Sequence, residues 1–305
     1  MKAVRPVKAG WFNAFRPWTL HGAVVAVAIG GAVAFKDGQF TGWLFTLALI
    51  GGCLLQSAAN LLNTYGDYTT GMDTVDNSLR TPELVTGALT PNGVLLAGIG
   101  CLLLTSLIGI VLIWEVGWGI IPFGVAGILG AALYTIGISY KYHGLGLVAV
   151  FLLMGILMPT GTYFVLTGGM SAEVFLIALP NAFLVTAVLS GNETRDYHED
   201  RRTGAKTLSS RFSYESSMRL YLILNTLPFV MLILLILSGV LPWTVALALL
   251  TVVELRSLHR NSREAHRNQV NNQLLVPLSF RLNWHFGALL VIGYLFGHHA
   301  IPGLI

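Results

Sequence analysis

Long apolar runs recur down the chain, and they limit its fold more than any other feature. Each continuous run of roughly 18 or more apolar residues is long enough to cross the hydrocarbon core of a bilayer as a helix. Inside lipid every backbone polar group needs a partner within the protein, which such runs obtain by forming a helical bundle. Composition agrees, because 54% of the residues are hydrophobic and 10% are charged, against about 25% charged in soluble domains. We therefore expect an all-α, polytopic integral membrane protein.

The runs predict about nine transmembrane helices within one domain that spans residues 1–305. They lie at roughly 18–35, 42–63, 93–113, 117–137, 146–167, 172–191, 218–238, 240–256 and 284–303. All but one of the 18 Lys and Arg residues fall before the first span or after an even-numbered span, and the exception is Lys36. Cytoplasmic loops carry such an excess of positive charge. We therefore expect a cytoplasmic N-terminus and, in a bacterium, insertion in the inner (cytoplasmic) membrane.

The segment before the first span mixes basic residues with Trp11, Phe12 and Phe15. This pattern over residues 1–17 predicts a short amphipathic segment that lies on the membrane surface. No basic stripe or soluble domain is present to bind nucleic acid. Cys53 and Cys101 fall inside apolar runs, so we interpret both as small core residues.

The first acidic cluster follows the second apolar run and reads Asn63-Thr-Tyr-Gly-Asp67-Tyr-Thr-Thr-Gly71-Met-Asp73. Residues four apart share one face of a helix, so Asn63 and Asp67 should point the same way. Asp73 would leave that face on a straight helix. It can rejoin only if the helix ends near Gly71, which we expect.

A second cluster repeats the pattern after the sixth run, with Asn192, Asp196 and Asp200 each four residues apart. Both clusters fall on the predicted cytoplasmic side, in segments 64–92 and 192–217, which we expect to be catalytic loops. The polar face of the first cluster continues into the apolar run through Asn60 and Gln56. Polar side chains that face lipid are energetically costly. We therefore expect this polar face to point into the bundle and not to be a solvated acidic surface.

Asp and Asn oxygens are ligands for a hard cation, either Mg²⁺ or Ca²⁺. Mg²⁺ commonly binds through a few carboxylates together with substrate phosphates. Two acidic helix ends on one face of the membrane therefore predict two Mg²⁺ ions that bridge a diphosphate. The predicted metal ligands, which are also predicted to be catalytic, are Asn63, Asp67, Asp73, Asn192, Asp196 and Asp200. The histidines are scattered without the spacing of a zinc site.

Lys141 is the remaining candidate for catalysis. It is either a topology determinant or a ligand that supplies positive charge to a phosphate. Arg195 has the same two interpretations and could also pair with a neighbouring Asp. Among the cations that follow Arg195, Lys206 is the best candidate for a functional role. His143 and His198, near the clusters, are either structural or substrate contacts. The predicted substrate-binding residues are Gln56, Asn60, Tyr134, Tyr140, Lys141, Arg195 and Lys206.

The two clusters resemble the Asp-rich motifs of the UbiA superfamily of intramembrane prenyltransferases. Further segments resemble that family in the same order along the chain: Arg16-Pro17-Trp-Thr-Leu20, Tyr142-His143-Gly-Leu-Gly146 and Gly161-Thr-Tyr163. The first motif is most similar to the branch that prenylates 1,4-dihydroxy-2-naphthoate in menaquinone synthesis. Departures from that branch are Thr64 and Leu147, where many of its members carry acidic residues.

The resemblance implies a Mg²⁺-dependent aromatic prenyltransferase with its active site facing the cytoplasm. It would transfer a polyprenyl group from an allylic polyprenyl diphosphate to 1,4-dihydroxy-2-naphthoate, releasing diphosphate and CO2 and giving demethylmenaquinone. Gln56 and Asn60 are the candidates for orienting the aromatic acceptor. The alternatives are the same chemistry on 4-hydroxybenzoate, homogentisate or a tetrapyrrole, and, more remotely, a cation-coupled membrane transporter.

Overall fold

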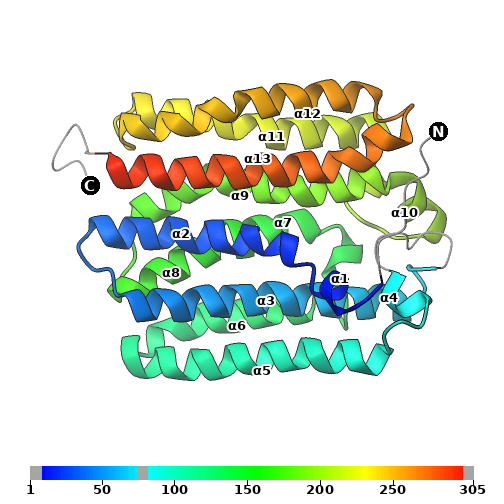
Figure 1. Cartoon of the computed structure of the whole chain (residues 1–305), viewed down its shortest axis with the longest axis horizontal. Helices are drawn as coiled ribbons and strands as arrows, with labels where there is room; N and C mark the ends of the chain where they lie inside the picture. The colour runs from blue at the N-terminus through cyan, green and yellow to red at the C-terminus, as the bar shows by residue number, and fades with distance from the viewer. Residues whose placement is uncertain (1–8, 75–81, 298–305) are drawn as a thin grey trace.

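Long helices run side by side through the structure, a computed structural model that describes residues 9–74 and 82–297 (Figure 1). No strand occurs in these two ranges. The α-helices are α1 (Trp11–Phe15), α2 (Leu20–Lys36), α3 (Gly42–Thr69), α4 (Pro82–Val85), α5 (Pro91–Val116), α6 (Ile121–Ala132), α7 (Gly146–Val150), α8 (Met158–Thr167), α9 (Ala172–Arg195), α10 (Tyr197–Thr203), α11 (Tyr214–Leu237), α12 (Val252–Glu264) and α13 (Gln269–Phe296). A π-helical segment, Phe151–Leu157, joins α7 to α8, and a 3-10 helix, Trp243–Thr251, leads into α12.

Seven helical segments of the described chain are long and apolar enough to cross a membrane. They are Trp11–Lys36, Gly42–Thr69, Pro91–Val116, Gly146–Thr167, Ala172–Arg195, Tyr214–Leu237 and Gln269–Phe296. This confirms the all-helical, polytopic membrane fold. The expected spans at 117–137 and 240–256 are also helical, but Trp118–Ala132 is shorter and the helix after Thr251 is polar. The count of nine and the cytoplasmic N-terminus therefore stay predictions.

Some expected boundaries are wrong. The last span begins at Gln269 and not near residue 284, because hydropathy locates the apolar part of a helix and misses its polar first turns. Arg281, expected in a loop, consequently lies inside α13. The segments 64–92 and 192–217 are also not loops throughout, since α3 continues to Thr69, α9 continues to Arg195 and α10 follows directly.

The bundle has a central helix, α9, which packs against α11, α13, α2 and the π-helical segment. On one side of it α3 packs against α5 and α6, and α2 packs against α8 and α13. Tyr221, Phe286 and Tyr294 are fully buried in the core. Figure 1 shows α1, α4 and α10 gathered at the same end of the bundle, so both acidic clusters lie at that end.

Candidate active site

A cavity of about 1440 Å³ opens between the helices at this end and extends into the bundle. Both acidic clusters line it, although they belong to helices far apart in the sequence. The predicted residues that line it are Asn63, Asp67, Asp73, Asn192, Asp196, Asp200, Lys141, Arg195, Gln56, Asn60, Tyr134 and Tyr140. Folding therefore brings nearly the whole predicted set around one space.

The end of α3 returns Asp73 towards Asp67, as expected from the sequence. The helix ends at Thr69, and Gly71 adopts a φ of 73°, a left-handed conformation that glycine adopts without strain. The backbone nitrogens of Met72 and Asp73 then donate to the carbonyl oxygen of Asp67 at 2.9 and 3.0 Å. The expectation that the helix ends near Gly71 is confirmed. Asp76, also an acid of this cluster, lies outside the described residues.

Lys141 reaches across to the first cluster and contacts both of its leading side chains. Its Nζ atom lies 2.9 Å from Oδ2 of Asp67 and 3.0 Å from Oδ1 of Asn63, and Tyr142 donates its hydroxyl to the same Asp67 carboxylate. Burial alone would lower the pKa of Lys141, but the Asp67 carboxylate raises it well above its ordinary value. Lys141 therefore stays a cation. Burial also raises the pKa of the Tyr140 hydroxyl, to about 12, so this neighbour stays neutral.

A close approach at Gly66 positions the segment that carries Lys141. A Cβ atom added at Gly66 would lie 2.8 Å from Cβ of Thr135 and 2.9 Å from its carbonyl oxygen. Thr135 also donates its hydroxyl to the carbonyl oxygen of Leu62 at 3.1 Å. The backbone after α6 is therefore seated directly on α3, which places Lys141 beside Asp67.

The second cluster has a cation of its own. Arg195 pairs with both carboxylate oxygens of Asp196, and its Nη1 atom donates to Oδ1 of Asn192 at 2.8 Å. Asp200 accepts a hydrogen bond from the Thr207 hydroxyl at 2.9 Å. Burial, followed by the negative charge of Asp196, raises the pKa of Asp200 to about 7. This cluster therefore holds more acidic groups than Arg195 neutralises.

The donor chemistry of the cavity fits a hard divalent cation. Carboxylate and amide oxygens are the ligands that Mg²⁺ prefers, and a cation would relieve the repulsion that acts on Asp200. Within the described ranges, no three His, Cys, Asp or Glu side chains lie close enough together to hold a metal ion by themselves. Bound ions would therefore need the amide oxygens of Asn63 and Asn192 and oxygens from a substrate, as is usual for Mg²⁺.

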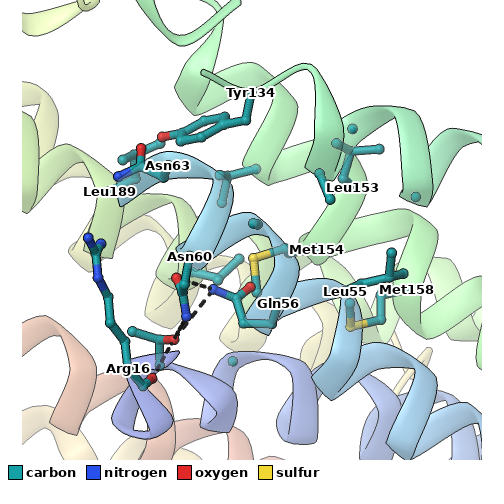
Figure 2. A pocket seen from close by; sticks show the side chains of 18 of the residues that line it. Arg16, Leu55, Gln56, Asn60, Asn63, Tyr134, Leu153, Met154, Met158 and Leu189 are labelled. Carbon is teal, nitrogen blue, oxygen red and sulfur yellow. Dashed lines mark hydrogen bonds between the residues drawn. The ribbon is translucent and has the colours of Figure 1, made fainter. Parts of the chain in front are cut away.

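A polar wall lies next to the first cluster, deeper along α3 (Figure 2). Asn60 donates to the Thr19 hydroxyl at 2.8 Å and to the carbonyl oxygen of Phe15 at 3.0 Å. The Gln56 amide lies 3.4 Å from Oδ1 of Asn60. These bonds hold the two amides against the junction of α1 and α2, with Arg16 beside them.

Arg16 is a cavity residue that was not predicted as a site residue. Its guanidinium donates to the Thr64 hydroxyl at 3.0 Å, and its backbone has a φ of 50°, which is strained for a residue other than glycine. The Arg16-Pro17-Trp-Thr-Leu20 segment was the sequence signal that could have assigned it. Tyr142 was missed as well, because its contact with Asp67 depends on the loop geometry.

The inner part of the cavity is apolar. Figure 2 shows Leu153, Met154 and Met158 on the side away from Asn63 and Tyr134. Leu153 and Met154 belong to the π-helical segment Phe151–Leu157, an irregularity that is frequent at functional sites. The cavity thus passes from a charged mouth to an apolar interior.

Lys206 does not join this arrangement. Its side chain is exposed and is not among the residues that line the cavity, although Ala205 and Thr207 on either side of it are. The predicted substrate contact of Lys206 therefore has no support from the cavity lining and stays a prediction. His198 lines the cavity, whereas His143 is exposed and lies outside its lining.

Comparison with known proteins agrees with this arrangement. A model described as the UbiA prenyltransferase family matches residues 23–284. "UbiA prenyltransferase domain-containing protein 1" of Gallus gallus is 31% identical over 291 residues, covering 93% of this chain and 84% of the relative. The "1,4-dihydroxy-2-naphthoate octaprenyltransferase" of Haemophilus influenzae is 32% identical over 212 residues, covering 66% of this chain and 68% of the relative.

Solved structures share the fold at low sequence identity. A "UbiA homolog from Archaeoglobus fulgidus bound to DMAPP and Mg2+" matches with a TM-score of 0.60 and 14% identity, covering 92% of this chain and 98% of that one. A "Digeranylgeranylglyceryl phosphate synthase" matches with a TM-score of 0.59 and 12% identity, covering 94% and 96%. These likenesses concern the arrangement of the helices.

Proposed function

The chain belongs to the UbiA prenyltransferase family, and we propose that it transfers a polyprenyl group from an allylic polyprenyl diphosphate to 1,4-dihydroxy-2-naphthoate. One observation carries this proposal. Two Asn–Asp pairs, one from α3 and one at the end of α9, each with its own cation, line the mouth of a single apolar cavity. That arrangement matches a substrate with a highly charged head and a long apolar tail.

The residues at the mouth would bind the diphosphate. Asn63, Asp67 and Asp73 from one side and Asn192, Asp196 and Asp200 from the other would hold two Mg²⁺ ions. The structure of the Archaeoglobus fulgidus homologue, bound to DMAPP and Mg²⁺, supports a metal and a prenyl diphosphate in this fold. When bound, Mg²⁺ supplies positive charge that makes diphosphate a better leaving group. Lys141 and Arg195 would add charge from the protein by donating to phosphate oxygens.

The apolar interior would hold the prenyl tail. Leu153, Met154 and Met158 line the cavity with side chains that carry no oxygen or nitrogen, so they would help to exclude water from the allylic carbon as its bond to diphosphate breaks. Water there would attack the cation-like carbon and hydrolyse the donor.

The polar wall would orient the acceptor. Because all three line the cavity, Arg16 would bind the acceptor carboxylate, and Gln56 and Asn60 would hydrogen-bond its ring hydroxyls. The ring carbon that bears the carboxylate forms the new bond to the prenyl carbon. CO2 then leaves and its bonding electrons return to the ring, so no base is needed to remove a ring proton. The products are diphosphate, CO2 and demethylmenaquinol, which oxidation converts to demethylmenaquinone.

Two observations support the naphthoate acceptor over other aromatic acids. The first motif has the form Asn-x-Tyr-x-Asp-x-x-x-Gly-x-Asp, which is similar to the naphthoate-prenylating branch of the family. The Haemophilus influenzae relative carries that activity in its name. The family match also favours transfer over cation-coupled transport. We further propose that the active site faces the cytoplasm, since the basic segments lie at that end of the bundle.

A prenyl-transfer assay with purified protein tests the proposal. It supplies Mg²⁺, labelled farnesyl or geranylgeranyl diphosphate and 1,4-dihydroxy-2-naphthoate, and follows lipid product and released CO2 together. We expect equal amounts of prenylated product and CO2, both lost on chelation of the metal. Parallel reactions contain 4-hydroxybenzoate or homogentisate instead.

Each outcome has a separate meaning. Product with another acceptor and none with the naphthoate would remove the acceptor assignment and keep the diphosphate site. Metal-dependent binding of the diphosphate without any product would have the same effect. No metal-dependent binding of the diphosphate would overturn the role given to both acidic clusters.

A further inference from the structure

A second groove lies on the outer edge of the bundle, between α11 and α12, which pack side by side (Figure 1). It has a volume of about 420 Å³ and is lined by Thr226, Leu255, Arg256, His259, Arg260 and Arg263. None of these residues lines the large cavity. The groove is therefore separate from the candidate active site.

The groove is cationic and has no counter-charge of its own. Arg256, Arg260 and Arg263 are spaced i, i+4 and i+7, so they share one face of α12, and all of them are exposed. No ion pair within residues 9–74 and 82–297 includes any of these arginines. Their charges are available to an external anion.

The acidic residues of α12 are engaged on other contacts. Glu254 accepts from Nδ1 of His285 at 2.6 Å and lies 3.5 Å from Nε of Arg281, both on α13. Glu264 accepts from Asn271 at 3.0 Å. The helix thus directs its carboxylates to α13 and its guanidinium groups to the groove.

If the predicted span at 240–256 crosses the membrane, the arginines at its end would lie at the depth of the lipid headgroups. The helical run towards them begins at Trp243, which is 73% exposed and is of a residue type enriched at membrane interfaces. From Trp243 to Arg256 the 3-10 and α-helical rises sum to about 24 Å, against a hydrocarbon core of about 30 Å. Arginine extends its head group beyond its backbone position, and Arg260 and Arg263 lie further out. In that placement the three guanidinium groups would lie in the headgroup layer.

Apolar side chains adjoin the charged ones. Val253, three residues before Arg256, is 68% exposed. On α11, Val230 follows Thr226 at i+4 and is also exposed, on the same side of the groove as Val253 because α11 and α12 run in opposite directions. The Thr226 hydroxyl lies 3.0 Å from Nε2 of His259, which ties the two helices together across the groove. The surface is therefore apolar towards the membrane interior and cationic towards its edge.

The geometry points to a binding site for an anionic phospholipid in this groove. The phosphate would be bound by Arg256, Arg260 and Arg263, since the guanidinium fork matches phosphate oxygens. The acyl chains would lie along Val253 and Val230. Basic pockets between transmembrane helices bind anionic headgroups by the same combination. The site does not depend on the proposed prenyl transfer.

Lipid binding by the purified full-length protein tests this inference. The protein in neutral detergent receives phosphatidylglycerol, phosphatidylcholine or inorganic phosphate at matched concentrations. Bound lipid is counted by native mass spectrometry, and Tm is recorded. We expect tighter binding of phosphatidylglycerol than phosphatidylcholine, by roughly tenfold or more, with a higher Tm and with weakening at high salt.

The variant R256Q/R260Q/R263Q should bind both lipids equally. Its matched control, R219Q/K206Q/R267Q, removes the same charge from exposed residues outside the groove. This control should still bind phosphatidylglycerol more tightly than phosphatidylcholine. A second variant, R256K/R260K/R263K, keeps the charge that directs membrane insertion and should bind phosphatidylglycerol more weakly than the unchanged protein.

Three results would overturn the inference. The first is equal binding of the two lipids by the unchanged protein. The second is a loss of the preference for phosphatidylglycerol in the control variant that equals the loss in R256Q/R260Q/R263Q. The third is a Tm rise with inorganic phosphate that matches the rise with phosphatidylglycerol. The last result would assign the groove to a soluble anion.

Discussion

Lys141 and Asp67 form a partly buried ion pair, with Nζ of Lys141 2.9 Å from Oδ2 of Asp67. The same ammonium lies 3.0 Å from Oδ1 of Asn63, so one cation contacts both leading side chains of the first cluster. Arg195 contacts Asn192 and Asp196 in the same way. In each half of the chain a protein cation thus neutralises the pair of side chains proposed to bind a metal ion.

Replacing Lys141 with Met should lower turnover by about 10²–10³-fold, the usual loss when one preorganised charge donor is removed. The reason is that Lys141 is proposed to contact the departing diphosphate. Without bound metal at the start, the Lys141→Met variant should bind Mg²⁺ at least as tightly as the unchanged protein, because the Lys141 ammonium no longer competes for Asp67. Steady-state assay and calorimetry measure the two effects. Lys206→Met, at an exposed position, should keep normal turnover, and equal losses in both variants would contradict the role of Lys141.

Asp196→Asn should abolish turnover while the protein remains folded and inserted. The substitution keeps the size of the side chain and removes the negative charge required for Mg²⁺. Asp37→Asn is the matched control, since Asp37 lies at the other end of α2, where its Oδ2 accepts from the Tyr163 hydroxyl at 2.7 Å, a bond that Asn can also accept. Prenyl-transfer rates and Tm values of both variants check this, and normal turnover in Asp196→Asn would rule out the metal role.

Gly66→Ala should destabilise the site and lower turnover together. The added methyl group would lie 2.8 Å from Cβ of Thr135 and 2.9 Å from its carbonyl oxygen, and overpacking of this kind costs about 1–3 kcal/mol. Lys141 would move away from Asp67 with the displaced loop. Gly100→Ala, where an added Cβ meets nothing within 4 Å, should leave turnover unchanged and raise stability slightly. A variant Gly66→Ala with normal Tm and normal turnover would show that the close approach is unimportant.

Binding of Mg²⁺ should strengthen as pH rises through about 7. Burial and the charge of Asp196 raise the pKa of Asp200 to about 7, so the metal-free site is partly protonated near neutral pH. Metal requires the carboxylate form, and affinity should therefore fall below pH 7 and level off above it. Calorimetry in buffers of different ionisation enthalpy would detect the released proton. Asp200→Asn should flatten the profile, whereas a flat profile in the unchanged protein would count against the prediction.

Ala48→Phe should shorten the preferred prenyl donor. Ala48 lines the cavity about four turns of α3 from Asn63, or roughly 22 Å at the helical rise, so a ring there would obstruct only long tails. Turnover of geranyl diphosphate should be retained while that of geranylgeranyl diphosphate falls. Leu49→Phe, at the neighbouring position outside the cavity lining, is the control. A uniform loss with all donors would mean that the residue affects folding and not tail length.

Local patterns determined much of this protein. The apolar runs by themselves predict the helical membrane bundle, because backbone groups in lipid have no other common way to pair. The i, i+4 spacing of Asn63 and Asp67 and the glycine at position 71 predict the shape of the first cluster, since helical periodicity and glycine's left-handed conformation act within a few residues.

The tertiary structure decided which distant residues meet. The pairing of Lys141 with Asp67, the place of Arg16 on the cavity wall and the exposure of Lys206 depend on how helices and loops pack. The contact at Gly66 is one such case, because it joins α3 to a segment about 70 residues later. The patterns of charge and hydropathy along the chain do not predict that contact. The helix start at Gln269 was missed for the same reason, since its polar turns are held by packing around the cavity mouth and not by lipid.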